Sequence, residues 1–208
     1  GDADRLIAVD ENGNIVDGDH IMVLSAIHLK NKGKLAQDTL VVTVMSNIGL
    51  TIAAKEHGIN LATTAVGDRY VLEEMKNSGY NLGGEQSGHM IFLDYNTTGD
   101  GVLSSLVLAQ IVLEEGKNLS ELAAVMTQYP QVLVNARIKN ENKNRYMEYP
   151  EIKSEIERIE KLLDGCGRVL IRPSGTEPLV RVMLEGKEEG QIKELATNLA
   201  NLIQEKLS

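Results

Sequence analysis

The chain has 208 residues, and its 42% of apolar and 25% of charged residues are typical of a folded globular protein. Its net charge of −9 and its aromatic content of 3% argue against a nucleic-acid surface, because such surfaces are basic and often stack bases on aromatic rings. The longest apolar stretch, 106–113, is too short to cross a bilayer, so no membrane association is expected. No secretory signal is visible, and the single cysteine, Cys166, excludes an internal disulfide. We therefore expect a cytoplasmic protein.

The first part of the chain alternates short apolar runs with helical patterns. Strands are expected over 5–10, 15–16, 40–45, 61–66 and 90–93, and helices over 20–30, 51–57, 67–77 and 101–115. The alternation predicts an α/β domain with a parallel sheet. The helix over 101–115 is apolar on nearly every face, so we expect it to be buried.

Turn and capping residues mark the ends of several of these elements. Asn12-Gly13 predicts a hairpin turn, and Asp17 is placed to cap the helix over 20–30. Asn118, with Glu121 three residues later, is typical of a capping box that begins another helix.

The pattern changes after Tyr129-Pro130, where we expect a domain boundary. Strands are expected over 132–138, 168–172 and 179–185. Ile152, Ile156, Ile159 and Leu163 share one helical face, and a last amphipathic helix carries apolar residues from 192 to 203. This part of the chain is therefore predicted to be a smaller α+β domain.

The chain begins with a loop that carries two alternating aspartates, Asp2 and Asp4, followed by Arg5. Carboxylates aimed from a tight loop can bind a hard cation such as Mg²⁺. Two carboxylates alone are a weak signal, and a solvated acidic segment is the alternative. Because the sequence opens without a methionine and enters an apolar run at once, we expect it to be part of a longer polypeptide.

A second loop, 83–89, has the sequence GGEQSGH. Its glycines let the backbone approach a ligand closely. Glu85 and Ser87 are two positions apart, so in an extended loop they would face the same side and could bind sugar hydroxyls. The alternatives are a flexible crossover loop and, for His89, a purely structural histidine.

A third loop, 172–178, has the sequence RPSGTEP and is expected to bind an anion. Arg172 offers a planar guanidinium, and Arg181 follows on the next expected strand. Ser174 and Thr176 add hydroxyls, while Gly175 exposes backbone N–H groups. A glycine- and proline-rich hairpin is the alternative interpretation. No serine or cysteine of the chain lies in a motif typical of an activated nucleophile.

Taken together and in this order, the three loops resemble the α-D-phosphohexomutase family. The metal loop of that family reads DGDxDR, and residues 1–5 match its last five positions. Residues 84–89 match the sugar loop GExSGH, and residues 172–178 match the phosphate loop RxSGTEP. Within the family, the bacterial phosphoglucosamine mutases look most similar, through VGDRYV at 66–71, GGEQSGHMIFLDYNTTGDG at 83–101 and RPSGTEPLVRVM at 172–183.

The resemblance implies a domain organisation and an activity. Residues 1–16 would be the end of the family's second domain, residues 17–128 its third domain, and residues 129–208 its fourth. The whole enzyme would interconvert glucosamine 6-phosphate and glucosamine 1-phosphate through a phosphoserine and a bisphosphate intermediate. The phosphoserine would lie in the missing N-terminal domains, so this chain alone should be inactive.

The resemblance also implies roles for individual residues. The metal ligands for one Mg²⁺ would include Asp2 and Asp4, and Arg5 would add positive charge beside them. The sugar would be held by residues of two segments: Glu85, Ser87 and His89, together with Gly67, Asp68 and Arg69 from the stretch 64–69. The phosphate that does not react would be held by Arg172, Ser174, Gly175, Thr176 and Arg181.

Two alternative functions stay open from the sequence. Another hexose specificity, as in a phosphoglucomutase or phosphomannomutase, is the nearest one. A non-catalytic module that binds sugar phosphates is a second, and the oligomeric state is undetermined, with a homodimer as one possibility. The expected partners are a hexosamine phosphate and the N-terminal domains of the same enzyme.

Overall fold

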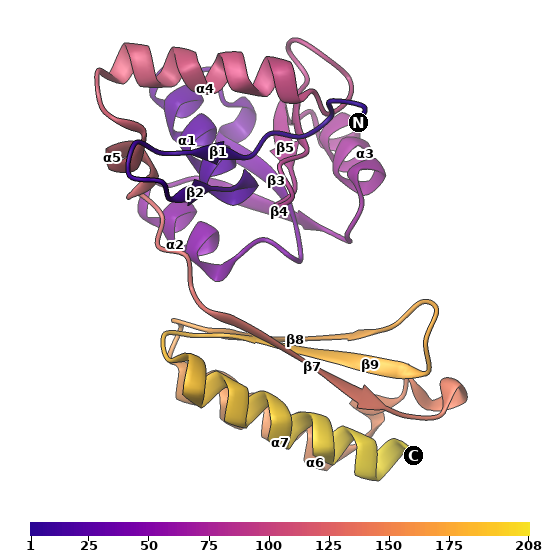
Figure 1. The fold of residues 1–208 in the computed structure, drawn as a ribbon. Helices are drawn as coiled ribbons and strands as arrows, with labels where there is room; N and C mark the ends of the chain where they lie inside the picture. The colour runs from indigo at the N-terminus through magenta and orange to yellow at the C-terminus, as the bar shows by residue number, and fades with distance from the viewer. The chain divides into compact units, whose positions relative to one another are not determined.

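The computed structural model describes residues 1–208, which divide into two units, residues 1–128 and 129–208 (Figure 1). Each unit has its own apolar core. No helix of the chain is long and apolar enough to cross a lipid bilayer. The predicted fold class, an α/β unit followed by a smaller α+β unit, is confirmed.

Unit 1 is built on a four-stranded sheet with the strand order β4-β3-β5-β6. The strands are β3 (Thr39–Thr43), β4 (Asn60–Thr64), β5 (Leu82–Gly84) and β6 (Met90–Phe92). As predicted, β3 runs parallel to β4, and it also runs parallel to β5. β6 is antiparallel to β5, because a short turn joins the two strands and leaves no room for a crossover.

Five helices accompany this sheet, and their caps follow the sequence signals. They are α1 (Gly18–Asn31), α2 (Ile48–Glu56), α3 (Asp68–Ser78), α4 (Gly101–Glu115) and α5 (Leu119–Ala123). The Asp17 side chain caps α1 by accepting a hydrogen bond from the His20 N–H. The predicted capping box of Asn118 and Glu121 is present at α5. A short 3₁₀ helix, Ala36–Asp38, precedes β3.

Of the expected strand over 5–10, only β1 (Ala8–Val9) forms, and it pairs with β2 (Ile15–Val16), while Arg5 makes an isolated bridge with His89. Two backbone hydrogen bonds hold the chain before β1: Leu6 N–H donates to the Gly88 carbonyl at 3.0 Å, and Gly101 N–H donates to the Ala3 carbonyl at 2.8 Å. These contacts replace the longer strand that the apolar pattern predicted.

Gly88 is a position where this packing requires glycine. Its φ of +91° is in the left-handed region, and a Cβ there would lie 2.1 Å from the Leu6 carbonyl oxygen. We expect Gly88→Ala to destabilise unit 1 by about 2–4 kcal/mol, because backbone strain and a backbone clash add. Gly116→Ala is the control: its φ is +63°, but the added Cβ meets nothing within 4 Å, so about 1 kcal/mol is expected. Urea unfolding followed by NMR signals of unit 1 measures both, and equal losses would contradict the packing argument.

The prediction that α4 is buried is wrong. Leu108 and Ile111 lie in the core, whereas Val102, Leu106 and Leu113 are 61%, 64% and 81% exposed. A helix that is apolar on all sides is expected to be buried on all sides, but the residues that bury it need not belong to the same chain. Here one face of α4 has no cover within residues 1–208.

Unit 2 is a three-stranded antiparallel sheet with two helices packed on it. The strands are β7 (Gln131–Arg137), β8 (Arg168–Pro173) and β9 (Leu179–Glu185), in the order β7-β9-β8, and the helices are α6 (Pro150–Leu163) and α7 (Glu189–Leu207). Two 3₁₀ turns, Asn140–Asn142 and Tyr146–Glu148, lie between β7 and α6. The predicted helical faces of α6 and α7 form the core with Val180, Val182 and Leu184 of β9. The alternate residues of β9, Arg181 and Met183 among them, lie on the opposite face of the sheet.

Candidate functional site

A cavity of about 310 Å³ lies where the parallel strands of unit 1 end. Thr43 is the last residue of β3, Val66 follows β4, and Glu85 follows β5. Ligands of open α/β sheets bind in the crevice outside the carboxyl ends of the strands, so this is the expected place for a site. The full lining consists of Arg5, Thr43, Met45, Val66, Glu85, Gln86 and Ser87.

The structure joins the two segments that were predicted to hold a sugar. The Gly67 N–H donates a hydrogen bond of 3.0 Å to Oε1 of Glu85. Gly67 has a φ of +133°, a conformation that side chains other than glycine rarely adopt. The bond fixes the Glu85 carboxylate at the cavity and leaves its second oxygen for a hydroxyl donor.

The loop over 83–89 differs from the extended segment predicted for it. Gly83 and Gly84 belong to β5, and the next four residues form a tight turn in which the Gly88 N–H donates to the Glu85 carbonyl at 3.0 Å. The prediction that Glu85 and Ser87 face one side of an extended chain is therefore wrong. Both residues nevertheless line the same cavity, because the turn folds over its edge.

His89, Asp68 and Arg69 lie outside the lining of this cavity. The His89 side chain is buried, with Nε2 at 3.9 Å from Oδ2 of Asp68 and with Nδ1 lacking a hydrogen-bond partner. Asp68 and Arg69 begin α3 and are exposed. A direct sugar contact of these three residues therefore stays a prediction.

The N-terminus of α1 contacts the turn formed by residues 85–88. The Gly18 N–H donates to the Gln86 carbonyl at 3.1 Å, and a Cβ on Gly18 would lie 2.3 Å from the Glu85 carbonyl oxygen. Burial alone would raise the pKa of Asp17, but hydrogen bonds from His20 and Gln86 outweigh it and lower that pKa. Asp17 is therefore ionised at neutral pH and holds both the helix cap and the turn.

The acidic segment at the start of the chain offers only part of a metal site. A hydrogen bond within the Asp2–Asp4 pair is the largest of several effects that lower the pKa of Asp2. No group of three or more His, Cys, Asp or Glu side chains is arranged to hold a metal ion. Two carboxylates fit Mg²⁺ as a partial ligand set, since this ion commonly takes one or two carboxylates together with water and substrate phosphate.

We accordingly expect this chain alone to bind Mg²⁺ weakly, with a dissociation constant on the order of millimolar or higher. This corresponds to a binding free energy of about 4 kcal/mol or less. Isothermal titration calorimetry with MgCl₂ measures it. An Asp2→Asn, Asp4→Asn double variant is the control and should remove what binding there is. Submicromolar affinity would contradict the assignment of a partial site.

In unit 2, two arginines face each other across neighbouring strands. Arg172 of β8 is paired directly with Arg181 of β9, and Asn135 of β7 is paired with Arg181 on its other side. Burial, with the positive charge of Arg181 added, lowers the pKa of Arg172. Like charges directly opposite each other destabilise a sheet, and the Glu177 carboxylate, whose Oε2 lies 3.6 Å from Arg181 Nη2, offsets part of this repulsion. The two guanidinium groups together form a candidate site for a phosphate.

The loop after β8 presents its backbone to solvent next to these arginines. Gly175 and Thr176 are exposed, whereas Ser174 is only 4% exposed. The Ser174 hydroxyl accepts a hydrogen bond of 3.1 Å from the Glu177 N–H, so its acceptor function stabilises the loop. Its proton remains available for an anion.

Some residues of these two sites were missed by the sequence analysis. Thr43 and Met45 line the cavity of unit 1, and their position just at the end of a β-branched strand was the signal that could have found them. Lys143 donates to the Ser174 carbonyl at 2.7 Å and brings a third cation to the phosphate loop. It is 31 positions away in sequence, and no motif marks it.

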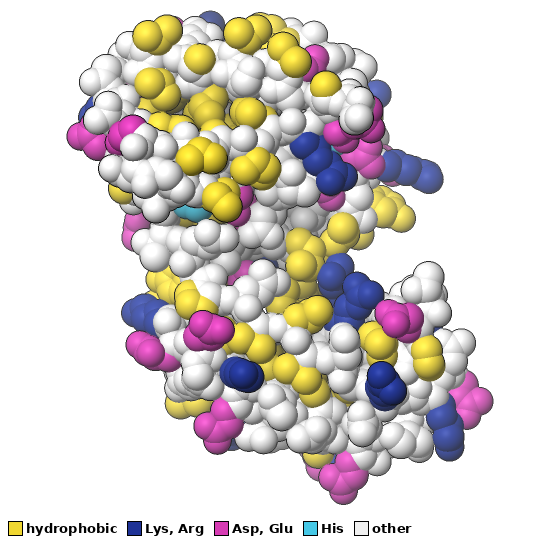
Figure 2. Space-filling view, viewed as in Figure 1, with side chains coloured by type: hydrophobic (Ala, Val, Ile, Leu, Met, Phe, Trp, Pro, Cys, Tyr) yellow, Lys and Arg dark blue, Asp and Glu magenta, His cyan; other side chains and the backbone are white.

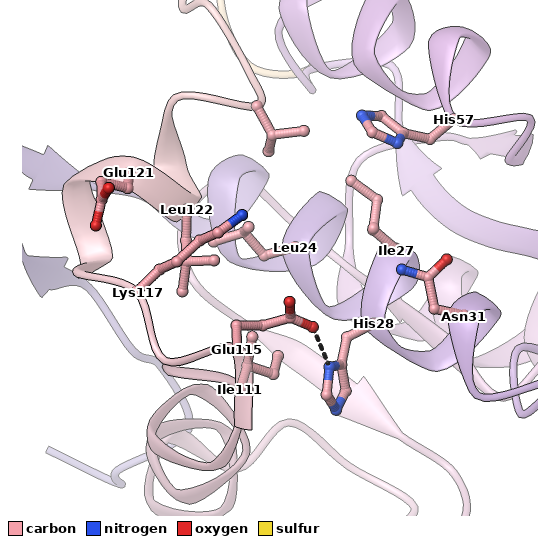
Figure 3. Close-up of a pocket in the computed structure, with 11 residues that line it drawn as sticks. Leu24, Ile27, His28, Asn31, His57, Ile111, Glu115, Lys117, Glu121 and Leu122 are labelled. Atoms are coloured by element: carbon pink, nitrogen blue, oxygen red, sulfur yellow. Dashed lines mark hydrogen bonds and ion pairs between the residues drawn. The ribbon is translucent and has the colours of Figure 1, made fainter. Parts of the chain in front are cut away.

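A second hollow, of about 240 Å³, lies among α1, α4 and α5 (Figure 3). His28 lies at its edge with Nε2 at 3.1 Å from Glu114 Oε2 and Nδ1 at 3.4 Å from Glu115 Oε1. None of the three predicted loops lines this hollow. The histidine and the two carboxylates instead tie α1 to α4.

The Glu114 carboxylate makes the stability of this contact between α1 and α4 depend on pH. Contacts with Lys32 first and Gln110 next lower the pKa of Glu114 from its usual 4.5 to about 2. A depressed carboxyl pKa stabilises the fold above pH 4.5, and the stabilisation is lost as the pH falls toward 2. We expect Glu114→Gln to lower the unfolding temperature of unit 1 at pH 6 and to have no effect near pH 2. An equal effect at both pH values in thermal unfolding would contradict this.

Comparisons with known proteins agree with both units. The family model described as phosphoglucomutase/phosphomannomutase, alpha/beta/alpha domain III, matches residues 17–129. The model described as phosphoglucomutase/phosphomannomutase, C-terminal domain, matches residues 133–202. The first match alone covers more than half of the chain.

Curated relatives and solved structures are similar over the whole chain. Phosphoglucosamine mutases of Clostridioides difficile and Caldanaerobacter subterraneus are 85% and 64% identical over all 208 residues, which are 46% of the length of each relative. The structure of Aspergillus fumigatus N-acetylphosphoglucosamine mutase in complex with GlcNAc-6P and magnesium aligns with a TM-score of 0.79 at 22% identity, over 98% of this chain and 51% of that one. At that identity the structural likeness shows the fold alone. The chain belongs to the phosphoglucomutase/phosphomannomutase family.

Proposed function

We propose that this chain is the C-terminal part of an enzyme that interconverts glucosamine 6-phosphate and glucosamine 1-phosphate. The observation that carries the proposal is the Glu85 carboxylate, which the Gly67 N–H holds at the cavity outside the carboxyl ends of the parallel strands. The names of the 85% and 64% identical relatives support the choice of amino sugar. In this proposal residues 1–16 end the second domain of the enzyme, residues 17–128 form the third, and residues 129–208 form the fourth.

The sugar would be oriented by unit 1. One oxygen of Glu85 is engaged by Gly67, and the other would accept a hydrogen bond from a sugar hydroxyl. Ser87 lies on the same cavity and can donate or accept, so it suits hydroxyls presented in either of two sugar orientations. Arg5 also lines the cavity and would place positive charge near a phosphoryl group.

The phosphate that does not react would be held by unit 2. Arg172 and Arg181 supply charge-assisted hydrogen bonds, and Gly175 and Thr176 add exposed N–H and hydroxyl donors. Holding one phosphate fixes the substrate, so that the reacting hydroxyl stays within reach of the phosphoryl donor.

The phosphoryl donor would come from outside this chain. A phosphoserine of the preceding region would give its phosphoryl group to the sugar phosphate, and the resulting bisphosphate would return its other phosphoryl group to the serine. Mg²⁺, held in part by Asp2 and Asp4, would neutralise charge on the transferring group. This chain alone should therefore show no turnover.

The test uses an extended chain, defined as this sequence preceded by the N-terminal part of the Clostridioides difficile relative that it does not cover. Coupled assays compare the phosphates of glucosamine, glucose and mannose. We expect kcat/KM to be highest for glucosamine 6-phosphate by about tenfold or more, which is about 1.4 kcal/mol of discrimination. A preference for glucose or mannose phosphate would contradict the proposed substrate and indicate a phosphoglucomutase or phosphomannomutase. Binding of a sugar phosphate without turnover would indicate a non-catalytic binding module.

A further inference from the structure

Lys143 lies in the connection between β7 and α6, and contacts on both sides of it fix that connection. Asn142 Nδ2 donates to the Leu207 carbonyl at the end of α7 at 3.0 Å. The Tyr146 hydroxyl donates to the Ile171 carbonyl of β8 at 3.3 Å. The chain around Lys143 is therefore held to a helix end and to a strand of the same unit.

The polar groups of Ser174 are engaged by nearby residues of the chain and by Lys143. The Ser174 N–H donates to the Leu179 carbonyl at 2.9 Å, and its hydroxyl accepts from the Glu177 N–H at 3.1 Å. The Ser174 carbonyl accepts from Lys143 Nζ at 2.7 Å. Lys143 thus supplies the contact that fixes this carbonyl from a distant segment.

The Ser174 carbonyl and the Gly175 N–H belong to the same peptide group. The peptide is trans, so its carbonyl and its N–H point in opposite directions. A contact that fixes the carbonyl therefore also fixes the direction of the Gly175 N–H. This N–H donates to no group of the chain, and Gly175 is exposed, so the donor is open to a ligand.

Steric contacts alone would leave this peptide group free to turn. A Cβ built on Gly175 would meet no atom within 4 Å, and glycine allows a wider range of backbone angles than other residues do. Without the contact from Lys143, the Gly175 N–H would point away from a bound anion for part of the time. The anion would then lose one of its hydrogen-bond donors.

We propose that Lys143 is a positioning residue of the phosphate site: its ammonium group holds the Ser174–Gly175 peptide so that the Gly175 N–H faces the bound phosphate. The proposal rests on the proposed function, in which the loop over 172–178 holds the phosphate that does not react. The ammonium group contacts the carbonyl end of the peptide, opposite the N–H that would donate to the phosphate.

Positive charge at this site is already supplied by two arginines. Arg172 and Arg181 are paired across β8 and β9, and Lys and Arg side chains gather on unit 2 near the loop that joins these strands (Figure 2). A charge that acts at a distance is screened by salt, whereas the orientation of a backbone donor is not. A positioning role and a purely electrostatic role of Lys143 therefore differ in their salt dependence.

NMR titration of the 208-residue chain with inorganic phosphate tests this role. Lys143→Met keeps the apolar stem but removes the donor, so we expect phosphate to bind about fivefold to tenfold more weakly, by the same ratio at low and at high salt. Lys143→Arg keeps a donor and should stay within about twofold of the wild type. Lys153→Met removes an exposed lysine from α6 and is the matched control, which should bind phosphate as the wild type does.

The Gly175 amide supplies a second measurement. In the free chain its ¹⁵N order parameter should fall in Lys143→Met and recover in Lys143→Arg, while the order parameters of β8 and β9 stay unchanged. In the extended chain, Lys143→Met should raise KM for glucosamine 6-phosphate about fivefold and change kcat by less than about twofold. The reason is that a phosphate that does not react is held alike in the ground state and in the transition state.

Wild-type phosphate affinity in Lys143→Met would overturn the proposal. A loss of affinity that disappears at high salt would overturn it in favour of a purely electrostatic role, and unfolding of unit 2 would overturn it in favour of a structural one. If phosphate shifted no signal of the loop in the wild-type chain, the phosphate assignment of the loop would fail together with the proposal. Turnover by the extended chain with an unchanged KM in Lys143→Met would remove Lys143 from the site and leave the proposed function standing.

Discussion

Replacing Glu85 with alanine in the extended chain is expected to lower kcat/KM for glucosamine 6-phosphate by about 100-fold or more. The carboxylate lies at the cavity outside the carboxyl ends of β3, β4 and β5, and its position is fixed by the Gly67 N–H. Without it the sugar hydroxyl has no acceptor at that point, and the substrate is misplaced relative to the phosphoryl donor. The fold should survive, because Glu85 is outside the apolar core clusters.

Two further variants make this result specific. Glu85→Gln keeps an oxygen for the Gly67 bond but replaces the free carboxylate oxygen with an amide donor, so an intermediate loss of kcat/KM is expected. Glu73→Ala removes the same charge from the exposed side of α3 and should leave the kinetics unchanged. Wild-type kinetics in Glu85→Ala, with the unfolding temperature preserved, would remove Glu85 from the site.

The second large effect is expected at the arginine pair of unit 2. Inorganic phosphate should bind the 208-residue chain with a dissociation constant on the order of millimolar, because a few charge-assisted contacts are offset by the entropy of binding. An NMR titration should shift the signals of Ser174, Gly175 and Thr176. Arg172→Ala should abolish these shifts, because Arg172 lies directly opposite Arg181 and beside the loop.

The same pair predicts an unusual stability result. Removing Arg172 relieves a like-charge contact, so Arg172→Ala should destabilise unit 2 little in the absence of phosphate. Phosphate should raise the unfolding temperature of the wild-type chain by mass action and leave that of the variant unchanged. Arg158→Ala removes an exposed arginine that is paired with Glu155 on α6 and serves as the control. Shifts centred elsewhere, or surviving in Arg172→Ala, would show that the loop is not the phosphate site.

The sequence predicted most elements because their signals are local. Asp17 and the Asn118–Glu121 box mark helix starts through contacts within four residues, and these were confirmed. The loop over 83–89 was predicted less well, since the alternation rule assumes an extended chain and the segment makes a hairpin turn instead. Hairpin register depends on pairing between β5 and β6, which a single strand pattern does not contain.

The burial of α4 could not be predicted for a different reason. The apolar pattern of Val102, Leu106 and Leu113 predicts that this helical face is buried. It does not show whether the residues that bury it belong to the same chain. Lys143 illustrates a third limit. It reaches the Ser174 carbonyl across 31 residues, and only the tertiary fold of unit 2 brings the two together.

In the proposed function, this chain supplies the sugar and phosphate contacts of a phosphosugar mutase but not its phosphoryl donor. ³¹P NMR of glucosamine 6-phosphate, with Mg²⁺ and a catalytic amount of glucose 1,6-bisphosphate, tests it when the extended chain and the 208-residue chain are compared side by side. We expect a growing glucosamine 1-phosphate signal with the extended chain and an unchanged spectrum with the 208-residue chain. Steady conversion by the 208-residue chain alone, or none by the folded extended chain, would contradict it.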